Sequence, residues 1–117
     1  MAYGSFEELE VWQRACRLSI EIINLMRNCR EWALRDQMMK ASLSIPSNIA
    51  EGAERGSIAD FIRFLHIAKG SAAELRTQLF IVRDLGGILP EAKCQDFIEE
   101  AKRLSSMLQS LIKSLRK

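Results

Sequence analysis

Valine, threonine, tyrosine and proline are scarce in this chain of 117 residues. It has one threonine (Thr77), two valines (Val11 and Val82), one tyrosine and two prolines. Because β-sheets favour β-branched and aromatic side chains, this composition excludes an all-β fold. Neither proline opens a long Pro- or Gly-rich linker between modules. The sequence therefore predicts an all-α protein that forms a single domain over residues 1–117.

The chain also lacks the cysteine patterns of disulfide scaffolds and zinc sites. Its three cysteines, Cys16, Cys29 and Cys94, are an odd number and include no CxxC pair, so we expect reduced residues of the core. The N-terminus carries acidic residues where a signal peptide is basic, and no run of about 18 uncharged apolar residues occurs. These features predict a cytoplasmic protein that has no membrane partner.

Charge of neither sign is in large excess. The chain carries 17 Lys and Arg against 15 Asp and Glu, a formal net charge of +2. Residues 1–54 hold 6 basic and 8 acidic groups, whereas residues 55–117 hold 11 and 7. This asymmetry is far smaller than that of a basic arm that binds nucleic acid. Hydrophobic residues make up 48% of the chain, which is enough for a packed core.

Hydrophobic periodicity predicts a first helix from Leu9 to about Asn28, after Ser5 and Glu8 at the spacing of a capping box. Its apolar residues form two rows that together cover roughly 200° of the helix, about twice the stripe that suffices for a surface helix. We therefore expect apolar surface in excess of one bundle face. The rows are Leu9, Trp12, Cys16, Ser19, Ile23 and Met26, and Val11, Ala15, Leu18, Ile22, Leu25 and Cys29.

Three more helices follow. The second is expected from about residue 31 to residue 56, with a kink at Pro46 because proline removes a backbone hydrogen bond. Ser57, with Asp60 three residues on, is expected to cap the third helix, which ends at Leu85 before two glycines. Pro90 suits the first turn of the fourth helix. Short connections between four long helices predict an up-down-up-down four-helix bundle.

The apolar residues of the third and fourth helices differ in arrangement. Those of the third scatter over most of its circumference, so we expect this helix to be largely buried. Those of the fourth recur at spacings of four and three residues, as in the seam of a bundle. The third-helix residues are Ile58, Phe61, Ile62, Phe64, Leu65, Leu75, Leu79, Phe80 and Val82, and the fourth-helix residues are Phe97, Ala101, Leu104, Leu108, Leu111 and Leu115.

Two polar rows are the first candidates for a functional site. One lies on the second helix (Gln37, Ser44, Asn48, Glu51, Arg55) and the other on the third (Asp60, Arg63, Ser71, Glu74, Gln78). They are either solvated faces of amphipathic helices, or a network in which Asn48, Glu51, Arg55, Ser71, Glu74 and Gln78 serve helix packing or a subunit contact. A ligand-binding or catalytic pocket is a third possibility, but two carboxylates alone define no reaction.

The sequence lacks the usual constellations of catalysis. His66 is the only histidine, and no cysteine lies at metal-ligand spacing from it, so we expect no metal site. Ser71 and Glu74 follow His66 at helical spacing, which chance explains as well as a catalytic triad does. No phosphate-binding glycine motif occurs. We therefore expect no enzyme activity and no cofactor. Trp12 and Trp32 fit the apolar periodicity and are expected to be packed anchors.

Three segments resemble a known family: FEELEVWQRA near the start, SIPSNIAEG around Pro46, and GSAAELRTQL in the third helix. They resemble the four-helix-bundle proteins encoded by 23S rRNA intervening sequences, over nearly the whole chain. The resemblance implies a cytoplasmic bacterial bundle that assembles into a ring of five and has no enzyme activity. The family includes accessory variability proteins of diversity-generating retroelements, which bind nucleic acid and a reverse transcriptase.

Two classes of function remain open from the sequence. One is a homo-oligomeric scaffold or interaction protein whose main partner is itself. The other is an RNA- or DNA-binding ring whose basic residues gather on one surface, with nucleic acid or a nucleic-acid-handling protein as partner. A solvated helix face explains the same residues. The candidates for nucleic-acid contact are Lys102, Arg103, Lys113, Arg116 and Lys117.

Overall fold

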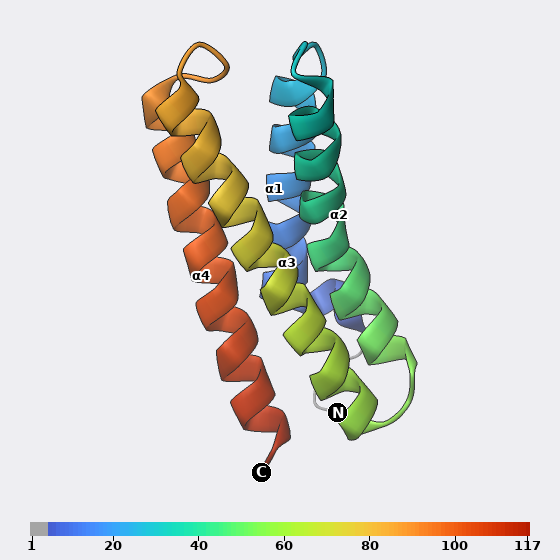
Figure 1. Cartoon of the computed structure of the whole chain (residues 1–117). Coiled ribbons are helices and arrows are strands. Elements are labelled where there is room, and N and C mark those ends of the chain that lie inside the picture. The colour runs from blue at the N-terminus through green and yellow to red at the C-terminus, as the bar shows by residue number, and fades with distance from the viewer. Residues whose placement is uncertain (1–4) are drawn as a thin grey trace.

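A computed structural model describes residues 5–117 as four long helices that run alternately up and down (Figure 1). A short 3-10 helix, η1 (Phe6–Glu8), precedes them. The long helices are α1 (Glu10–Met26), α2 (Trp32–Glu54), α3 (Ile58–Leu85) and α4 (Glu91–Leu115). The predicted all-α bundle is confirmed.

The helix ends follow the predicted signals with one difference. The Ser57 hydroxyl accepts a hydrogen bond from the backbone N–H of Asp60 at 3.1 Å, so the predicted cap of α3 is present. Gly86 ends α3 with a φ of 73°, a conformation that glycine adopts without strain. The Ser5 backbone N–H donates to the Glu8 carboxylate at 3.0 Å, so the predicted capping box is present. It caps the N-terminal end of η1, however, and not that of α1, which starts at Glu10.

Pro46 lies inside α2, and the helix continues on both sides of it from Trp32 to Glu54. The side chain of Pro46 is buried. The kink predicted at this position stays a prediction.

The bundle is an elongated body of about 46 × 20 × 20 Å with its core along the long axis. Buried side chains from all four helices form one cluster, which includes Ile22, Ile45, Leu65 and Leu104. α3 packs against both α2 and α4, whereas α1 packs mainly on α2 and only lightly on α4. The side between α1 and α4 is therefore the loosest of the four.

An ion pair joins α1 to α4 on that loose side. The Arg14 guanidinium donates to both carboxylate oxygens of Glu100, at 2.6 and 3.0 Å. Glu100 raises the pKa of Arg14 above its ordinary value, mainly through this hydrogen bonding. Two parallel hydrogen bonds from a planar guanidinium fix geometry as well as charge. Arg14 thus ties α1 to α4.

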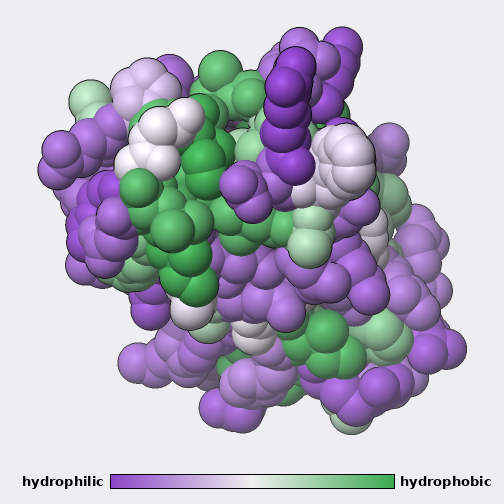
Figure 2. Space-filling model, turned by 45° about the horizontal axis from the view of Figure 1, so that its top comes forward, coloured by the Kyte–Doolittle hydropathy of each residue, from purple (hydrophilic) through white to green (hydrophobic). Residues whose placement is uncertain are grey.

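The structure corrects the prediction that α3 is largely buried. One face of the helix enters the core, but Ile58, Ile67, Phe80, Ile81 and Leu85 are exposed. Figure 2, which brings the end with the α1–α2 and α3–α4 connections forward, shows a hydrophobic patch on the surface there. The apolar residues of α3 scatter around the helix because some belong to its outer surface. Of the residues that the structure describes, no helix is both long and apolar enough to cross a membrane.

Candidate interaction surfaces

Small polar side chains join α2 to α3 along their line of contact. The hydroxyls of Ser44 and Ser71 lie 2.8 Å apart in a hydrogen bond. The Asn48 amide donates to the Ser44 carbonyl at 2.8 Å and to the Ser44 hydroxyl at 2.9 Å. All three side chains are half-buried. Part of the two predicted polar rows therefore faces the neighbouring helix.

Gly52 lets the two helices approach closely. A Cβ atom at this position would lie 2.6 Å from the Phe64 Cβ and 3.3 Å from the Phe61 carbonyl oxygen. Real Cβ atoms do not come this close to other atoms, so only glycine fits without a shift of the backbone. The segments SIPSNIAEG and GSAAEL thus hold residues on both sides of the α2–α3 contact, and Phe64 lies six residues before the second segment.

The charged residues of the polar rows lie at the edge of this contact. Glu51 and Glu74 are exposed and, within residues 5–117, neither makes a hydrogen bond or an ion pair. Arg55 and Arg63 place their guanidinium carbons 4.9 and 4.6 Å from the centre of the Phe64 ring. The role of Glu51, Arg55 and Glu74 in a subunit contact stays a prediction.

Gln78 extends the same row towards the end of α3. Its side-chain oxygen is buried and has no hydrogen-bond partner among the described residues. The hydrogen bond between Ser44 and Ser71 sets the antiparallel alignment of α2 and α3. Counting along both helices from this pair brings Gln78 level with the exposed Gln37. A buried amide oxygen that makes no hydrogen bond costs free energy.

An apolar strip lies on the outer side of the α1–α2 pair. The Ser19 hydroxyl, buried between the helices, donates to the Ser42 carbonyl at 2.7 Å. The residue after each serine points 100° further around its helix, towards solvent: Ile20 is 58% exposed and Leu43 is 46% exposed. Half-buried side chains at helical spacing continue this surface. We define the α1–α2 strip as Cys16, Ile20, Ile23, Met39 and Leu43.

This strip agrees with the excess apolar surface predicted for the first helix. Val11, Ala15, Leu18 and Ile22 of one row are buried in the core, but Leu25 of the same row is 42% exposed. In the other row, Cys16 and Ile23 are only half-buried. One bundle face therefore does not cover all the apolar residues of the two rows.

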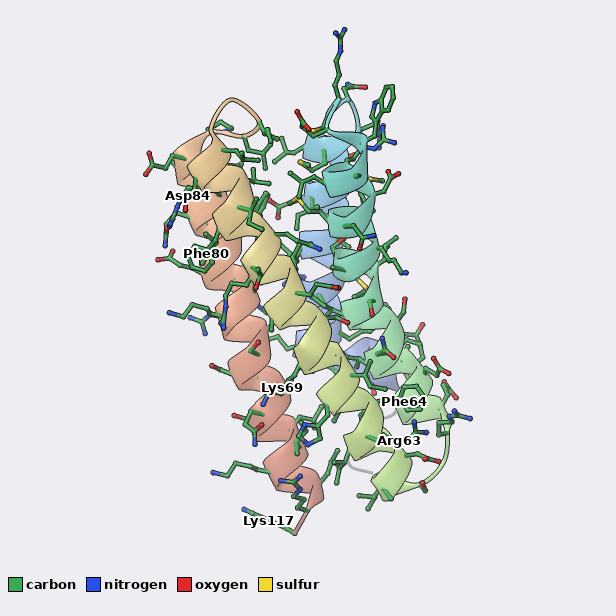
Figure 3. All side chains as sticks on the ribbon, viewed as in Figure 1. Arg63, Phe64, Lys69, Phe80, Asp84 and Lys117 are labelled. Carbon is green, nitrogen blue, oxygen red and sulfur yellow. The ribbon has the colours of Figure 1, made fainter. Side chains whose placement is uncertain are left out.

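Basic side chains gather on the outer side of the α3–α4 pair. Lys69 donates to Gln109 at 2.6 Å, and Arg83 donates to Gln95 at 3.4 Å. These two pairs fix the antiparallel alignment of the helices, which places Arg76 opposite Lys102. Figure 3 shows Lys69 between α3 and α4, and Phe64 on the other side of α3, near α2. We define the basic face as Lys69, Arg76, Lys102, Lys113 and Arg116.

The predicted nucleic-acid residues divide between this face and other places. Lys102, Lys113 and Arg116 belong to the basic face, and all three are exposed. Arg103, one residue after Lys102, points 100° around α4 towards the α1 side, and Lys117 lies at the C-terminal end (Figure 3). Sequence reasoning missed Lys69 and Arg76, because they are on a different helix. None of these residues forms an ion pair within the described part of the chain.

The candidate catalytic residues are not brought together. The Ser71 hydroxyl bonds to Ser44 on the α2 side of α3, whereas His66 lies on the α4 side, 3.3 Å from the Arg116 guanidinium. Burial raises the pKa of the Cys16 and Cys94 thiols, which keeps both in the unreactive neutral form. Within residues 5–117, no three His, Cys, Asp or Glu side chains are grouped so that they could hold a metal ion.

Comparison with known proteins identifies the family. The model of the 23S rRNA-intervening sequence protein family matches residues 7–110. This chain belongs to that family. A solved structure with the same fold is a protein of unknown function from the S23 ribosomal protein family of Bacteroides thetaiotaomicron, with a TM-score of 0.82 and 24% sequence identity. The alignment covers 88% of this chain and 98% of that one. No curated protein matches.

The prediction that both tryptophans of this 23S rRNA-intervening sequence protein are packed is wrong for Trp32, which lies at the end of the bundle with the α1–α2 and α3–α4 connections, here called the loop end. Trp12 is half-buried, and its ring meets the Phe6 ring edge-on at 5.3 Å between centroids. Trp32 is not packed: it is 66% exposed at the first turn of α2. At the same end of the bundle, the α1–α2 and α3–α4 connections border an open cleft of about 680 Å³. Leu25, Asn28, Cys29, Arg30, Glu31, Leu85, Gly86, Gly87 and Ile88 line this cleft.

Proposed function

We propose that this 23S rRNA-intervening sequence protein is a non-enzymatic, homo-oligomeric interaction protein whose subunits associate side by side through the α1–α2 strip. The exposure of Ile20 and Leu43 carries this proposal. Single exposed apolar residues are ordinary on a protein surface, but a contiguous apolar strip along two packed helices is typical of an interaction site. The strip would bury its apolar area against a neighbouring subunit.

The position of the other exposed apolar residues favours a ring. Ile67, Ile81 and Leu85 lie on α3, on a different side of the bundle from the α1–α2 strip. A contact that joins two different faces is repeated from copy to copy and closes into a ring when the rotation allows it. The proposed number of five subunits comes from the family resemblance, because the geometry of one chain does not define it.

Light scattering at micromolar concentration tests this proposal. The wild-type protein is expected to give a multiple of the chain mass of 13.3 kDa, five times that mass for a single ring. The double variant Ile20→Glu/Leu43→Glu is expected to lose side-by-side assembly, because each carboxylate would be buried in an apolar contact. Ile58→Glu is the matched control: Ile58 is 52% exposed but lies outside the strip. A monomeric wild-type protein overturns the proposal.

A second candidate function, RNA binding, is favoured by the basic face. Five cationic side chains from two helices line one surface there, and α4 carries no acidic residue after Glu100. Copies of this face in an assembly would add their fields, which attract phosphates and release counterions. We propose that this face contacts the phosphate backbone without sequence preference.

The salt dependence of RNA affinity tests the second candidate. For a single-stranded oligonucleotide, the log-log slope of affinity against salt is expected to fall by about 0.7 for each phosphate contact that is lost. The variant Arg76→Glu/Lys102→Glu/Lys113→Glu should therefore reduce the slope by about 2 units and weaken binding strongly. Arg17→Glu/Lys40→Glu/Arg103→Glu makes the same charge change off the face and serves as control. Equal effects of the two variants would contradict a role for the basic face.

A further inference from the structure

An exposed tryptophan adjoins an open cleft at the loop end of the bundle. Trp32 directly follows residues 28–31, which form one wall of the cleft, while Leu85, Gly86, Gly87 and Ile88 form the other wall. The indole of Trp32 is not among the groups that line the cleft and is 66% exposed. Figure 2 shows that hydrophobic surface extends over this end of the molecule. A large exposed apolar side chain and an open cleft thus belong to the same end of the bundle.

The chemistry of the cleft suits an indole. The lining is mixed: Leu25, Leu85 and Ile88 offer apolar contact, whereas Asn28, Glu31 and the backbone of the two glycines offer polar groups. A tryptophan side chain combines an apolar body with one N–H donor, so it can use both kinds of contact in such a lining. Tryptophan is also among the residues that contribute most to protein interfaces. The cleft of about 680 Å³ has room for one indole.

We propose that the loop end docks onto the loop end of a second copy, with the Trp32 indole of each copy in the cleft of the other. Because the tryptophan and the cleft are on the same end, one two-fold axis satisfies both at once. This contact is separate from the α1–α2 strip. It deepens the proposed function, since it would join two side-by-side assemblies end to end.

The charges at the rim identify a second copy as the occupant. Arg30 and Glu31 are adjacent, carry opposite charges and both line the cleft, so a two-fold axis can bring Arg30 of one copy to Glu31 of the other. The nearby Arg35 already pairs with Asp36 at 3.0 Å, and Arg83 already pairs with Asp84 at 3.1 Å. The charges around the cleft are therefore mixed in sign, which favours a mixed-charge partner such as its own copy over a polyanion.

Side-by-side assembly is expected to strengthen the end-to-end contact. One copy offers one tryptophan and one cleft, but a ring repeats the contact once for each subunit. Linked contacts act at a high effective concentration, so the combined affinity exceeds that of a single pair. End-to-end pairing is therefore expected to double the mass of the side-by-side assembly.

The mass and the fluorescence of Trp32 test the inference together. Trp32→Ala is expected to halve the mass that light scattering gives for the wild-type protein, while leaving the helical circular dichroism unchanged. In a Trp12→Phe protein, Trp32 is the only tryptophan, and its emission should lie at shorter wavelength when assembled and shift to longer wavelength on dilution. An unchanged mass for Trp32→Ala, or emission typical of a solvated indole at every concentration, overturns the inference.

A charge swap adds a readout that a merely structural role of Trp32 would not change. Arg30→Glu and Glu31→Arg are each expected to weaken the end-to-end contact, because like charges then face each other across the axis. The double variant Arg30→Glu/Glu31→Arg restores opposite charges and should restore the doubled mass. Failure of this rescue counts against the two-fold arrangement. If Trp32→Ala lowers RNA affinity without a change in mass, the end contacts nucleic acid and the inference is wrong.

The inference and the proposed function fail in different ways. Ile20→Glu/Leu43→Glu should give single chains that pair only as the concentration is raised, because the loop ends can still dock but the contact is no longer repeated by a ring. A wild-type protein that forms only such pairs contradicts side-by-side assembly and supports the end-to-end contact. If Ile20→Glu/Leu43→Glu reduces the mass to that of one chain, and Trp32→Ala leaves the wild-type mass unchanged, only side-by-side assembly is supported.

Discussion

Replacement of Gly52 by alanine is expected to lower the free energy of unfolding by about 1 to 3 kcal/mol. The new methyl group would lie 2.6 Å from the Phe64 Cβ, and it would also approach the Phe61 carbonyl oxygen at 3.3 Å. Neither atom is the free end of a flexible side chain, so α2 and α3 must separate to make room. Thermal or denaturant unfolding measures the loss.

The matched control is Gly70→Ala. Gly70 also lies inside a helix, but a Cβ atom there meets nothing within 4 Å. Alanine has a higher helix propensity than glycine, so this variant is expected to be more stable by about 0.5 to 1 kcal/mol. Opposite signs for the same substitution at two helical glycines would show that close approach, and not helix propensity, sets the requirement at position 52. A Gly52→Ala protein as stable as wild type contradicts the close contact.

The close approach of α2 and α3 is also the reason why the Ser44–Ser71 hydrogen bond can form. Short side chains reach across the contact at 2.8 Å only if the backbones are close, and Gly52 keeps them close two turns further along α2. Gly52→Ala is therefore expected to weaken this hydrogen bond as well. The stability losses of Gly52→Ala and Ser71→Ala are therefore expected not to add up in the double variant, because both changes affect the same contact.

Local signals predicted the fold well, because each acts within one or two turns of chain. Ser57 caps α3 with its own side chain, and Gly86 takes up the positive φ that ends the helix. Of the six residues predicted for the seam of α4, Phe97, Ala101, Leu104 and Leu108 are buried. Leu111 and Leu115 are only partly buried. These features need no knowledge of which helix lies alongside.

Surface positions were harder to predict, since exposure depends on neighbouring helices. Periodicity showed that Trp32 and Phe80 are apolar at helical spacing, but it carried no information on whether another helix covers them. Trp32 lies at the start of α2, beyond the reach of the core, and Phe80 lies on the outer side of α3. The two wrong predictions therefore have the same physical cause.

The basic face could not be predicted from one helix, because it forms only where α3 and α4 are aligned. The sequence singled out Lys102 and Lys113 because both are basic residues of α4. Lys69 and Arg76 join them only through the antiparallel alignment that the Lys69–Gln109 and Arg83–Gln95 hydrogen bonds fix. No spacing within one helix could have predicted this neighbourhood.

The unpaired oxygen of Gln78 leads to the second large expected effect. Methionine has a similar volume and no polar atom that needs a hydrogen bond, so Gln78→Met is expected to raise the free energy of unfolding by about 1 kcal/mol. Gln78→Glu puts charge in the same place and is expected to lower it by about 1 to 3 kcal/mol at neutral pH. Denaturant unfolding of the two variants gives the difference.

Gln37 provides the control for both changes, because it belongs to the polar row predicted on α2 but is exposed. Gln37→Met and Gln37→Glu should each change stability by less than about 0.5 kcal/mol, as is usual for surface positions. If Gln78→Met instead lowers stability, the Gln78 oxygen has a partner after all. If that variant also reduces the mass in solution, the partner belongs to another subunit, and the contact between subunits includes the α2–α3 side of the bundle as well as the α1–α2 strip.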